Sequence, residues 1–253
     1  MQSKMQERNT MNADIKPDKA FENLEFLGSQ GARTIRILSE YLEPLQRMAE
    51  LKVNSTVLFL GSARVDPGAR DSALFPYYWE AEDLAYRLAK WAINLTPKGK
   101  NFVICTGGGP GIMEAANRGA ARAGGKSIGM NISLPLEQYP NPYISPELSF
   151  LFHYFFMRKF WLVYKAKAVV AFPGGYGTLD EVFETLTLIQ TQKIQKKNLF
   201  ICLYGEDYWR KVINFDALVE YGAISPEDRD IFTFFSDTDK AFSIWKERLS
   251  LHL

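Results

Sequence analysis

Residues 168–190 have the sequence AVVAFPGGYGTLDEVFETLTLIQ, and this stretch predicts the fold. Its first five residues are all apolar, as expected of a strand buried on both faces of a parallel sheet. Three glycines follow within the next five residues, and apolar side chains then recur at helical spacing between Thr178 and Gln190. A strand, a glycine-rich turn and a helix in this order form the repeating unit of parallel α/β sheets.

The same unit recurs on both sides of this stretch. Further strands are expected at 56–60, 102–105, 128–132, 199–204 and 231–235. Helices are expected at 81–92, 112–123, 154–166 and 207–221, with a last one from Asp237. The alternation predicts an α/β fold with a Rossmann-like doubly wound parallel sheet in one catalytic domain, residues 53–253.

The N-terminal part is expected to be different. Residues 1–30 are polar and mixed in charge for most of their length, which predicts a flexible tail. Residues 31–52 have apolar side chains at helical spacing and are expected to form a helical extension. Pro44 lies inside this pattern, so we expect a kink or a break there.

Composition excludes several classes of protein. The 30 Lys and Arg residues against 29 Asp and Glu give a net charge of +1, which argues against a nucleic-acid binder. Two cysteines and two histidines are too few for a disulfide framework or a typical zinc site. The polar N-terminus and the absence of a long apolar run predict no secretory leader and no membrane partner. We therefore expect a cytoplasmic protein.

Three strand ends carry glycine or small polar residues: Gly61-Ser62, Gly107 to Gly111, and Gly174 to Thr178. Glycine lets the backbone approach a ligand closely, and free N–H groups at a helix start hold an anion. Together the three turns indicate a phosphate-bearing ligand. The dinucleotide motif GxGxxG fails because Ile112 replaces its third glycine, and the P-loop motif fails because Ala120 replaces its first.

Charged residues occur in two of the expected helices. Arg158 and Lys159 lie in a helix that is otherwise aromatic and apolar. Asp180 and Glu181 lie in the first turn after the Gly174–Thr178 loop. Either acid could simply stabilise the helix dipole, so position alone does not select one of them for chemistry.

These residues resemble a known family. Residues 173–181, PGGYGTLDE, resemble the PGGxGTxxE signature of the LONELY GUY (LOG) family of cytokinin-activating phosphoribohydrolases. Residues 107–114, GGGPGIME, resemble the second glycine motif of the family, and Arg158-Lys159 its basic pair. The resemblance extends over roughly residues 55–250.

The resemblance implies hydrolysis of the N-glycosidic bond of a nucleoside 5′-monophosphate, without a metal or an organic cofactor. It implies that Arg158 and Glu181 are the catalytic residues. Family members are dimers or larger assemblies with the site near the subunit interface, so a homo-oligomer is expected. The residues expected to bind the nucleotide and its phosphate are Gly61, Ser62, Gly107, Gly108, Gly109, Met113, Phe155, Lys159, Gly174, Gly175, Gly177 and Thr178.

Phe155-Phe156-Met157 precedes the basic pair, where short plant members have Met and His. This lead and the N-terminal helix resemble the longer bacterial members, several of them described as AMP nucleosidases, so AMP or an N6-modified AMP is the expected substrate. The main alternative is a binding protein of the same fold, such as a molybdenum-cofactor carrier, which needs the phosphate loop but not the carboxylate. The older family label "lysine decarboxylase" finds no visible pyridoxal-phosphate motif in this sequence.

Overall fold

The computed structural model describes residues 17–95, 102–135, 139–195 and 199–250. The chain divides into two compact units, Met1–Leu42 and Glu43–Leu253. The helices and strands, in chain order, are α2 (Leu24–Gly28), α3 (Arg33–Glu50), β1 (Thr56–Leu60), α4 (Phe75–Leu95), β2 (Val103–Thr106), α5 (Ile112–Arg122), β3 (Ser127–Ile132), β4 (Ser149–Phe152), α6 (Phe155–Tyr164), β5 (Ala166–Ala171), α7 (Tyr176–Gln190), β6 (Phe200–Tyr204), α8 (Glu206–Val212), α9 (Phe215–Glu220), β7 (Phe232–Phe235) and α10 (Thr238–Ser250). Short 3₁₀ helices, Pro146–Leu148 and Pro226–Ile231, precede β4 and β7.

The second unit is built on one sheet. Within the described residues its seven strands have the order β4-β3-β2-β1-β5-β6-β7, and every neighbouring pair is parallel. Leu58 of β1 pairs with Cys105 of β2 on one side and with Val169 of β5 on the other. The predicted α/β fold with a doubly wound parallel sheet is confirmed.

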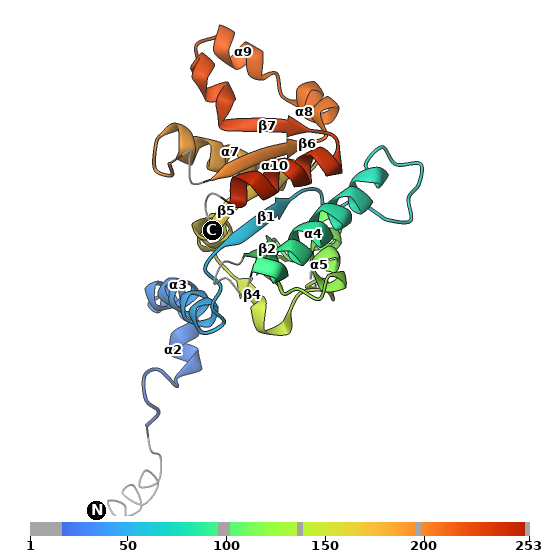
Figure 1. Ribbon diagram of the computed structural model, residues 1–253. Helices are drawn as coiled ribbons and strands as arrows, with labels where there is room; N and C mark the ends of the chain where they lie inside the picture. The colour runs from blue at the N-terminus through green and yellow to red at the C-terminus, as the bar shows by residue number, and fades with distance from the viewer. Residues whose placement is uncertain (1–16, 96–101, 136–138, 196–198, 251–253) are drawn as a thin grey trace, which may run out of the picture. The chain divides into compact units, whose positions relative to one another are not determined.

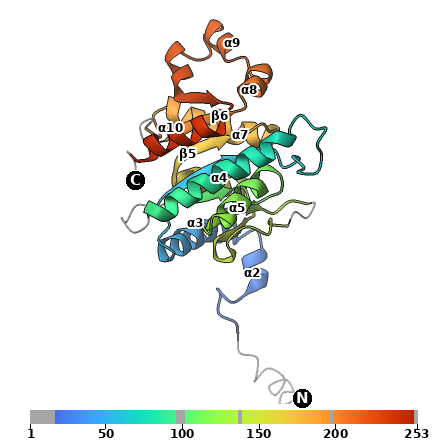
Figure 2. The ribbon, with the colours of Figure 1, turned by 45° about the vertical axis from the view of Figure 1, so that its right-hand side comes forward.

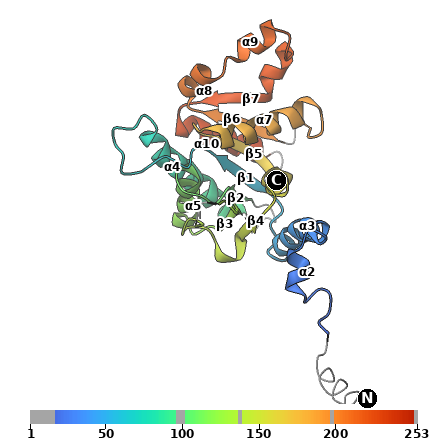
Figure 3. The ribbon, with the colours of Figure 1, turned by 180° about the vertical axis from the view of Figure 1, so that it is seen from behind.

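Helices cover both faces of this sheet. Helices α4, α5 and α10 lie on one face (Figures 1 and 2), and α7 lies on the other (Figure 3). All five residues of β1 are buried, which explains why its sequence is a continuous apolar run and not an alternating one. The core on the first face joins residues of β1 to α4 and α10, such as Phe59, Leu84 and Trp245.

The strand order places a switch point between β1 and β5. From β1 the chain moves outward through β2 and β3 to β4, and it then returns to β5 on the opposite side of β1. The connections after β1 and β5 therefore leave the sheet in opposite directions. A crevice forms at the carboxyl ends of two such strands, and this is where α/β proteins bind ligands.

One expectation about the helices is wrong, and one of the two outcomes expected at Pro44 is absent. The helix expected at 207–221 is two helices, α8 and α9, because Ile213 is extended (φ −130°, ψ 119°) and the Asn214 side chain caps α9 by accepting from the Ala217 N–H. At Pro44, where a kink or a break is expected, the chain does not break, since α3 continues through this residue. Side-chain pairs four residues apart, Glu43 with Arg47 and Gln46 with Glu50, support the helix at this point.

Strand β4 was not predicted. It has only four residues, Ser149–Phe152, and lies at the edge of the sheet beside β3. Its neighbour α6 ends at Tyr164, and β5 begins at Ala166, so the expected helix 154–166 is shorter at both ends.

The predicted tail is described only from residue 17, and residues 1–16 lie outside the described part. Within residues 17–30 the chain forms α2, whose N-cap Asn23 accepts from the Phe26 N–H. The Arg36 guanidinium donates to the carbonyls of Leu27 and Ser29, both at 2.6 Å. No helix of the described ranges is both long and apolar enough to span a bilayer.

Candidate active site

A cavity of about 550 Å³ lies at the switch point. The residues expected to be catalytic, Arg158 and Glu181, both line it. Seven of the expected ligand-binding residues also line it: Gly61, Ser62, Met113, Gly174, Gly175, Gly177 and Thr178. The volume is within the range of small-molecule sites in proteins. The predicted residues that line this cavity come from four separate segments of the sequence.

The loop after β5 forms one wall of this cavity. Gly174 is held inside the fold, because a Cβ there would strike the Thr178 hydroxyl and come within 3.0 Å of the Ser62 nitrogen. A Cβ at Gly175 or at Gly177 would meet nothing within 4 Å. Gly175 is the N-cap of α7 and offers no side-chain acceptor to the first N–H groups of that helix. Those groups and the open space around them are suited to an anion.

The loop after β1 forms the adjacent wall. The Ser62 N–H donates to the Pro173 carbonyl at 3.0 Å, and the Ser62 carbonyl accepts from the Ile112 N–H at 3.1 Å. Gly111 has φ +69°, and a Cβ there would strike that same carbonyl. Ser62 thus fixes the loops after β1, β2 and β5 to one another.

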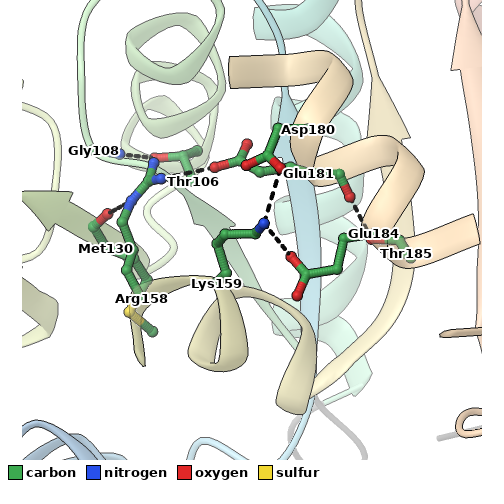
Figure 4. Close-up of polar contacts among 9 residues, drawn as sticks. All are labelled: Thr106, Gly108, Met130, Arg158, Lys159, Asp180, Glu181, Glu184 and Thr185. Atoms are coloured by element: carbon green, nitrogen blue, oxygen red, sulfur yellow. Dashed lines mark hydrogen bonds and ion pairs between the residues drawn. The ribbon is translucent and has the colours of Figure 1, made fainter. Parts of the chain in front are cut away.

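The glycine loop after β2 is held by buried amides. The Asn141 side chain donates to the carbonyls of Gly108 and Gly109 at 3.2 and 3.0 Å, and to the Asn117 side chain at 2.9 Å. The Thr106 hydroxyl accepts from the Gly108 N–H at 2.9 Å (Figure 4). Gly108 and Gly109 are buried and are not part of the cavity lining.

Gly107 has a different place. A Cβ at this position would strike the Arg158 guanidinium and lie 2.8 Å from the Met113 sulfur. The expected ligand-binding residue Gly107 therefore provides room for Arg158 and for the Met113 side chain beside it.

Arg158 and Glu181 form an ion pair between α6 and α7. The Arg158 Nη1 donates to the Glu181 Oε1 at 2.8 Å, and its Nε donates to the Met130 carbonyl at 2.8 Å (Figure 4). The two side chains are only 11% and 13% exposed. A carboxylate held in this way can stabilise a nearby positive charge or accept a proton from water. The neighbouring Asp180 pairs with Lys159 instead (Figure 4).

Burial affects the acid–base properties of this pair. It raises the pKa of the Glu181 carboxyl above its ordinary value of 4.5, and the adjacent Arg158 guanidinium opposes this rise. Burial also raises the pKa of the Cys105 thiol to about 12, although the Arg158 charge acts to lower it. Cys105 therefore stays neutral at physiological pH and is unsuited to act as a nucleophile.

Besides the glycines of the loop after β2, two further expected ligand-binding residues do not line the cavity. Lys159 pairs with Asp180 at 2.9 Å and with Glu184 at 3.0 Å, and it lines a separate cavity of about 410 Å³ along α6 and α7. Phe155 is 53% exposed and lines neither cavity. Both residues belong to α6, but Arg158 is the one that lines the cavity at the switch point.

Five residues of the cavity were not among the expected site residues: Ala63, Arg64, Tyr176, Leu179 and Tyr208. The Tyr208 hydroxyl donates to the Gly174 carbonyl at 2.7 Å and so supports the loop from α8. Nothing in the sequence links Tyr208 to that loop. Arg64 does have a signal in the sequence, because it is the first charged residue after the Gly61-Ser62 strand end. Among the described residues, no group of three His, Cys, Asp or Glu is placed to hold a metal ion.

The chain matches the profile of a known protein family. The profile of a family described as "Possible lysine decarboxylase" matches residues 113–244, which is more than half of the chain. The matched range extends from α5 to α10 and includes both Arg158 and Glu181.

Curated relatives carry LOG names. The "Probable cytokinin riboside 5'-monophosphate phosphoribohydrolase LOGL5" of Oryza sativa subsp. japonica is 29% identical over 177 residues, 69% of this chain and 64% of the relative. Cytokinin riboside 5'-monophosphate phosphoribohydrolase LOG1 of Arabidopsis thaliana is 40% identical over 75 residues, 29% of this chain and 34% of LOG1. The matches span less than two thirds of the length of these relatives.

Solved structures are similar in fold. TM1055, a structural genomics target, has a TM-score of 0.53 at 21% identity, and the match covers 76% of this chain and 99% of TM1055. The molybdenum cofactor carrier protein MCP of Chlamydomonas reinhardtii has a TM-score of 0.51 at 18% identity, covering 78% of this chain and 99% of its own. At these identities the likeness concerns the fold alone. The family profile and the curated relatives go further than the fold, and they show that the chain belongs to the LONELY GUY (LOG) family.

Proposed function

We propose that this protein hydrolyses the N-glycosidic bond of a purine nucleoside 5′-monophosphate, giving a free base and ribose 5-phosphate. The observation that carries the proposal is the Arg158–Glu181 ion pair, which lines a cavity beside the exposed N-terminus of α7. The names of the curated relatives, which are phosphoribohydrolases of nucleoside monophosphates, support the same chemistry.

Each part of the cavity has a role in this reaction. The loop from Gly174 to Thr178 binds the 5′-phosphate through the free N–H groups of α7. As the bond from C1′ to the base breaks, its electron pair goes to the base and positive charge develops on the ribose. The Glu181 carboxylate stabilises this charge and takes a proton from the water whose oxygen bonds to C1′. The departing base gains a proton from solvent, and Glu181 returns its proton to solvent before the next turnover. Arg158 holds Glu181 in position and contributes to binding the nucleotide.

The main alternative is a carrier that binds a phosphorylated ligand without cleaving it. The similarity to MCP suggests this possibility, but it concerns the fold only. A carrier has no use for a carboxylate buried against an arginine at the base of its phosphate loop, so the hydrolase is favoured. A pyridoxal-phosphate decarboxylase, as the family label suggests, needs a lysine for the Schiff base. The cavity is lined by arginines and, in the described part of the chain, by no lysine.

AMP or an N6-modified AMP is the proposed substrate, as in the longer bacterial branch of the family. We also propose that the protein is a homo-oligomer with the site near the subunit interface. Support comes from α6, which carries Arg158 on its buried side and Phe156, Phe160 and Tyr164 on exposed positions. Exposed aromatic side chains grouped on one helix are typical of an association surface.

The test measures by chromatography the free base that the protein releases from AMP, GMP, CMP and isopentenyl-AMP. We expect adenine or isopentenyladenine release by the wild-type protein, and a reduction of kcat by about 10²- to 10⁴-fold in Glu181→Gln. Glu184→Gln is the matched control, because Glu184 lies one turn further along α7 and does not line the cavity. Binding of AMP without base release in the wild type would reject the hydrolase and favour the carrier.

A further inference from the structure

The charged side chains that line the cavity differ in whether they already have a partner within the protein. Two arginines line it, Arg64 and Arg158. The Arg158 guanidinium is already bound to the Glu181 carboxylate and to the Met130 carbonyl. This pair is close to neutral as a unit, so it offers little net charge to a phosphate that carries up to two negative charges. A second cation is needed for a phosphate dianion to bind well.

Arg64 is the other arginine that lines the cavity. Its side chain is exposed, and within the described ranges its guanidinium has no hydrogen bond or ion pair. Its backbone, in contrast, is fixed, because the Arg64 N–H donates to the Ser62 hydroxyl at 3.0 Å. Lys159, the other basic residue expected to bind a ligand, is paired with two carboxylates and lines a different cavity.

Arg64 also lies beside the phosphate loop. Ser62, two residues before it, donates to the Pro173 carbonyl and packs against Gly174. The segment carrying Arg64 is thus attached to the start of the loop that leads into α7. An anion at the first turn of α7 is within reach of a long side chain from this neighbouring segment. The planar guanidinium can then bind two phosphate oxygens at once.

We propose that Arg64 binds the 5′-phosphate of the substrate and makes the site selective for nucleoside 5′-monophosphates over nucleosides. This inference rests on the proposed function for the identity of the substrate, but not on cleavage of the bond. Arg64 completes a phosphate site whose other half is the N-terminus of α7.

The experiment compares Arg64→Ala and Arg64→Lys with the wild-type protein in calorimetric binding of ribose 5-phosphate and of ribose. Arg70→Ala is the matched control, since Arg70 is an exposed arginine of the same connection that does not line the cavity. We expect Arg64→Ala to bind ribose 5-phosphate about 10- to 100-fold more weakly, in line with the loss of a charged hydrogen-bonded contact. The affinity of Arg64→Lys for ribose 5-phosphate should lie between those of the wild type and Arg64→Ala, and the affinity of Arg70→Ala should equal that of the wild type. Thermal melts confirm that the variants are folded.

Steady-state kinetics separates this proposal from the proposed function. The KM for AMP should rise in Arg64→Ala by a similar factor, with kcat much less affected. If the wild type releases adenine and Arg64→Ala keeps its affinity for ribose 5-phosphate and its KM, Arg64 has no such role and the hydrolase stands. If Arg64→Ala loses affinity but the wild type releases no base, Arg64 keeps its role and the hydrolase fails. A wild type that binds neither ribose 5-phosphate nor AMP would overturn both.

Discussion

Arg158 is a buried cation in a helix whose exposed positions are aromatic. Counting backbone and side chain together, Arg158 is 9% exposed, whereas Phe155 and Phe156 on the same helix are 53% and 51% exposed. A buried charge without a partner is strongly destabilising, so Arg158 depends on Glu181 and on the Met130 carbonyl. Removing one member of the ion pair leaves the other uncompensated. Glutamine at position 181 retains a neutral acceptor for Arg158, and it is therefore a better test of chemistry than alanine.

The raised pKa of Glu181 predicts the pH dependence of the reaction. Burial raises the pKa of this carboxyl above 4.5, and the carboxylate is the proposed working form. Activity should therefore be lost as the pH falls through the raised pKa, so that kcat/KM has an acid limb with its midpoint above 4.5. The measurement is kcat/KM for base release between pH 4 and pH 9.

The control for this profile is the residual activity of Glu181→Gln. The second ionisation of the substrate phosphate, near pH 6, affects both proteins, so only the difference between the two profiles reports on Glu181. A limb that is identical in both proteins, or one with its midpoint at or below 4.5, would contradict the assignment of Glu181 as the working carboxylate.

At the scale of the element, the loop into α7 contains glycines of two kinds. A Cβ at Gly174 would strike Thr178 and approach the Ser62 backbone, so Gly174→Ala should lower the free energy of unfolding by about 1–3 kcal/mol. A Cβ at Gly175 meets open space, so Gly175→Ala should change stability by less than about 0.5 kcal/mol. If a ligand occupies that space, Gly175→Ala should still raise the KM for the nucleotide. Urea unfolding and base-release kinetics measure the two effects.

This pair of variants serves as its own control. Equal stability losses would mean that the space around Gly175 closes in solution. A Gly175→Ala protein with unchanged stability and unchanged KM would place the ligand elsewhere in the cavity.

The long elements were predictable because their patterns are strong. The apolar runs of β1 and β5 and the glycines that follow them are sufficient to predict a parallel sheet with a site at its carboxyl edge. Strand β4 was not predictable, since four residues at a sheet edge give too short a pattern. The break between α8 and α9 depends on the capping of one backbone N–H by Asn214, and the apolar spacing does not reveal it.

The sequence predicts the site residues that lie next to the ends of strands. It does not predict the ones whose place depends on the direction in which a helix side chain points. Gly61 and Ser62 follow β1 directly, Gly174 lies in the loop after β5, and parallel strands bring them to one edge. Adjacent residues of a helix point in different directions, and this separates Arg158 from Lys159 although both are basic. Tyr208 reaches the loop from α8, and this contact depends on the packing of elements that are not adjacent in sequence.

At the scale of the whole molecule, the exposed aromatic residues of α6 predict self-association. We expect light scattering to give a dimer or a larger assembly, and Phe156→Glu to weaken it by at least about 10-fold, because a charge would replace an apolar contact worth roughly 1.5–3 kcal/mol. Tyr221→Glu is the matched control, since Tyr221 is 89% exposed and follows α9 instead. A wild-type protein that stays monomeric at every concentration tested would contradict the prediction.

The strand order also has a consequence for synthesis. Strand β1 lies in the middle of the finished sheet, yet one of its two neighbours, β5, begins only at Ala166. A nascent chain that has emerged only as far as β4 therefore presents β1 as a bare apolar edge, with its backbone N–H and carbonyl groups unpaired. Such edges recruit other strands. Until β5 is made, the strand that later carries one wall of the cavity is therefore open to pairing with other chains.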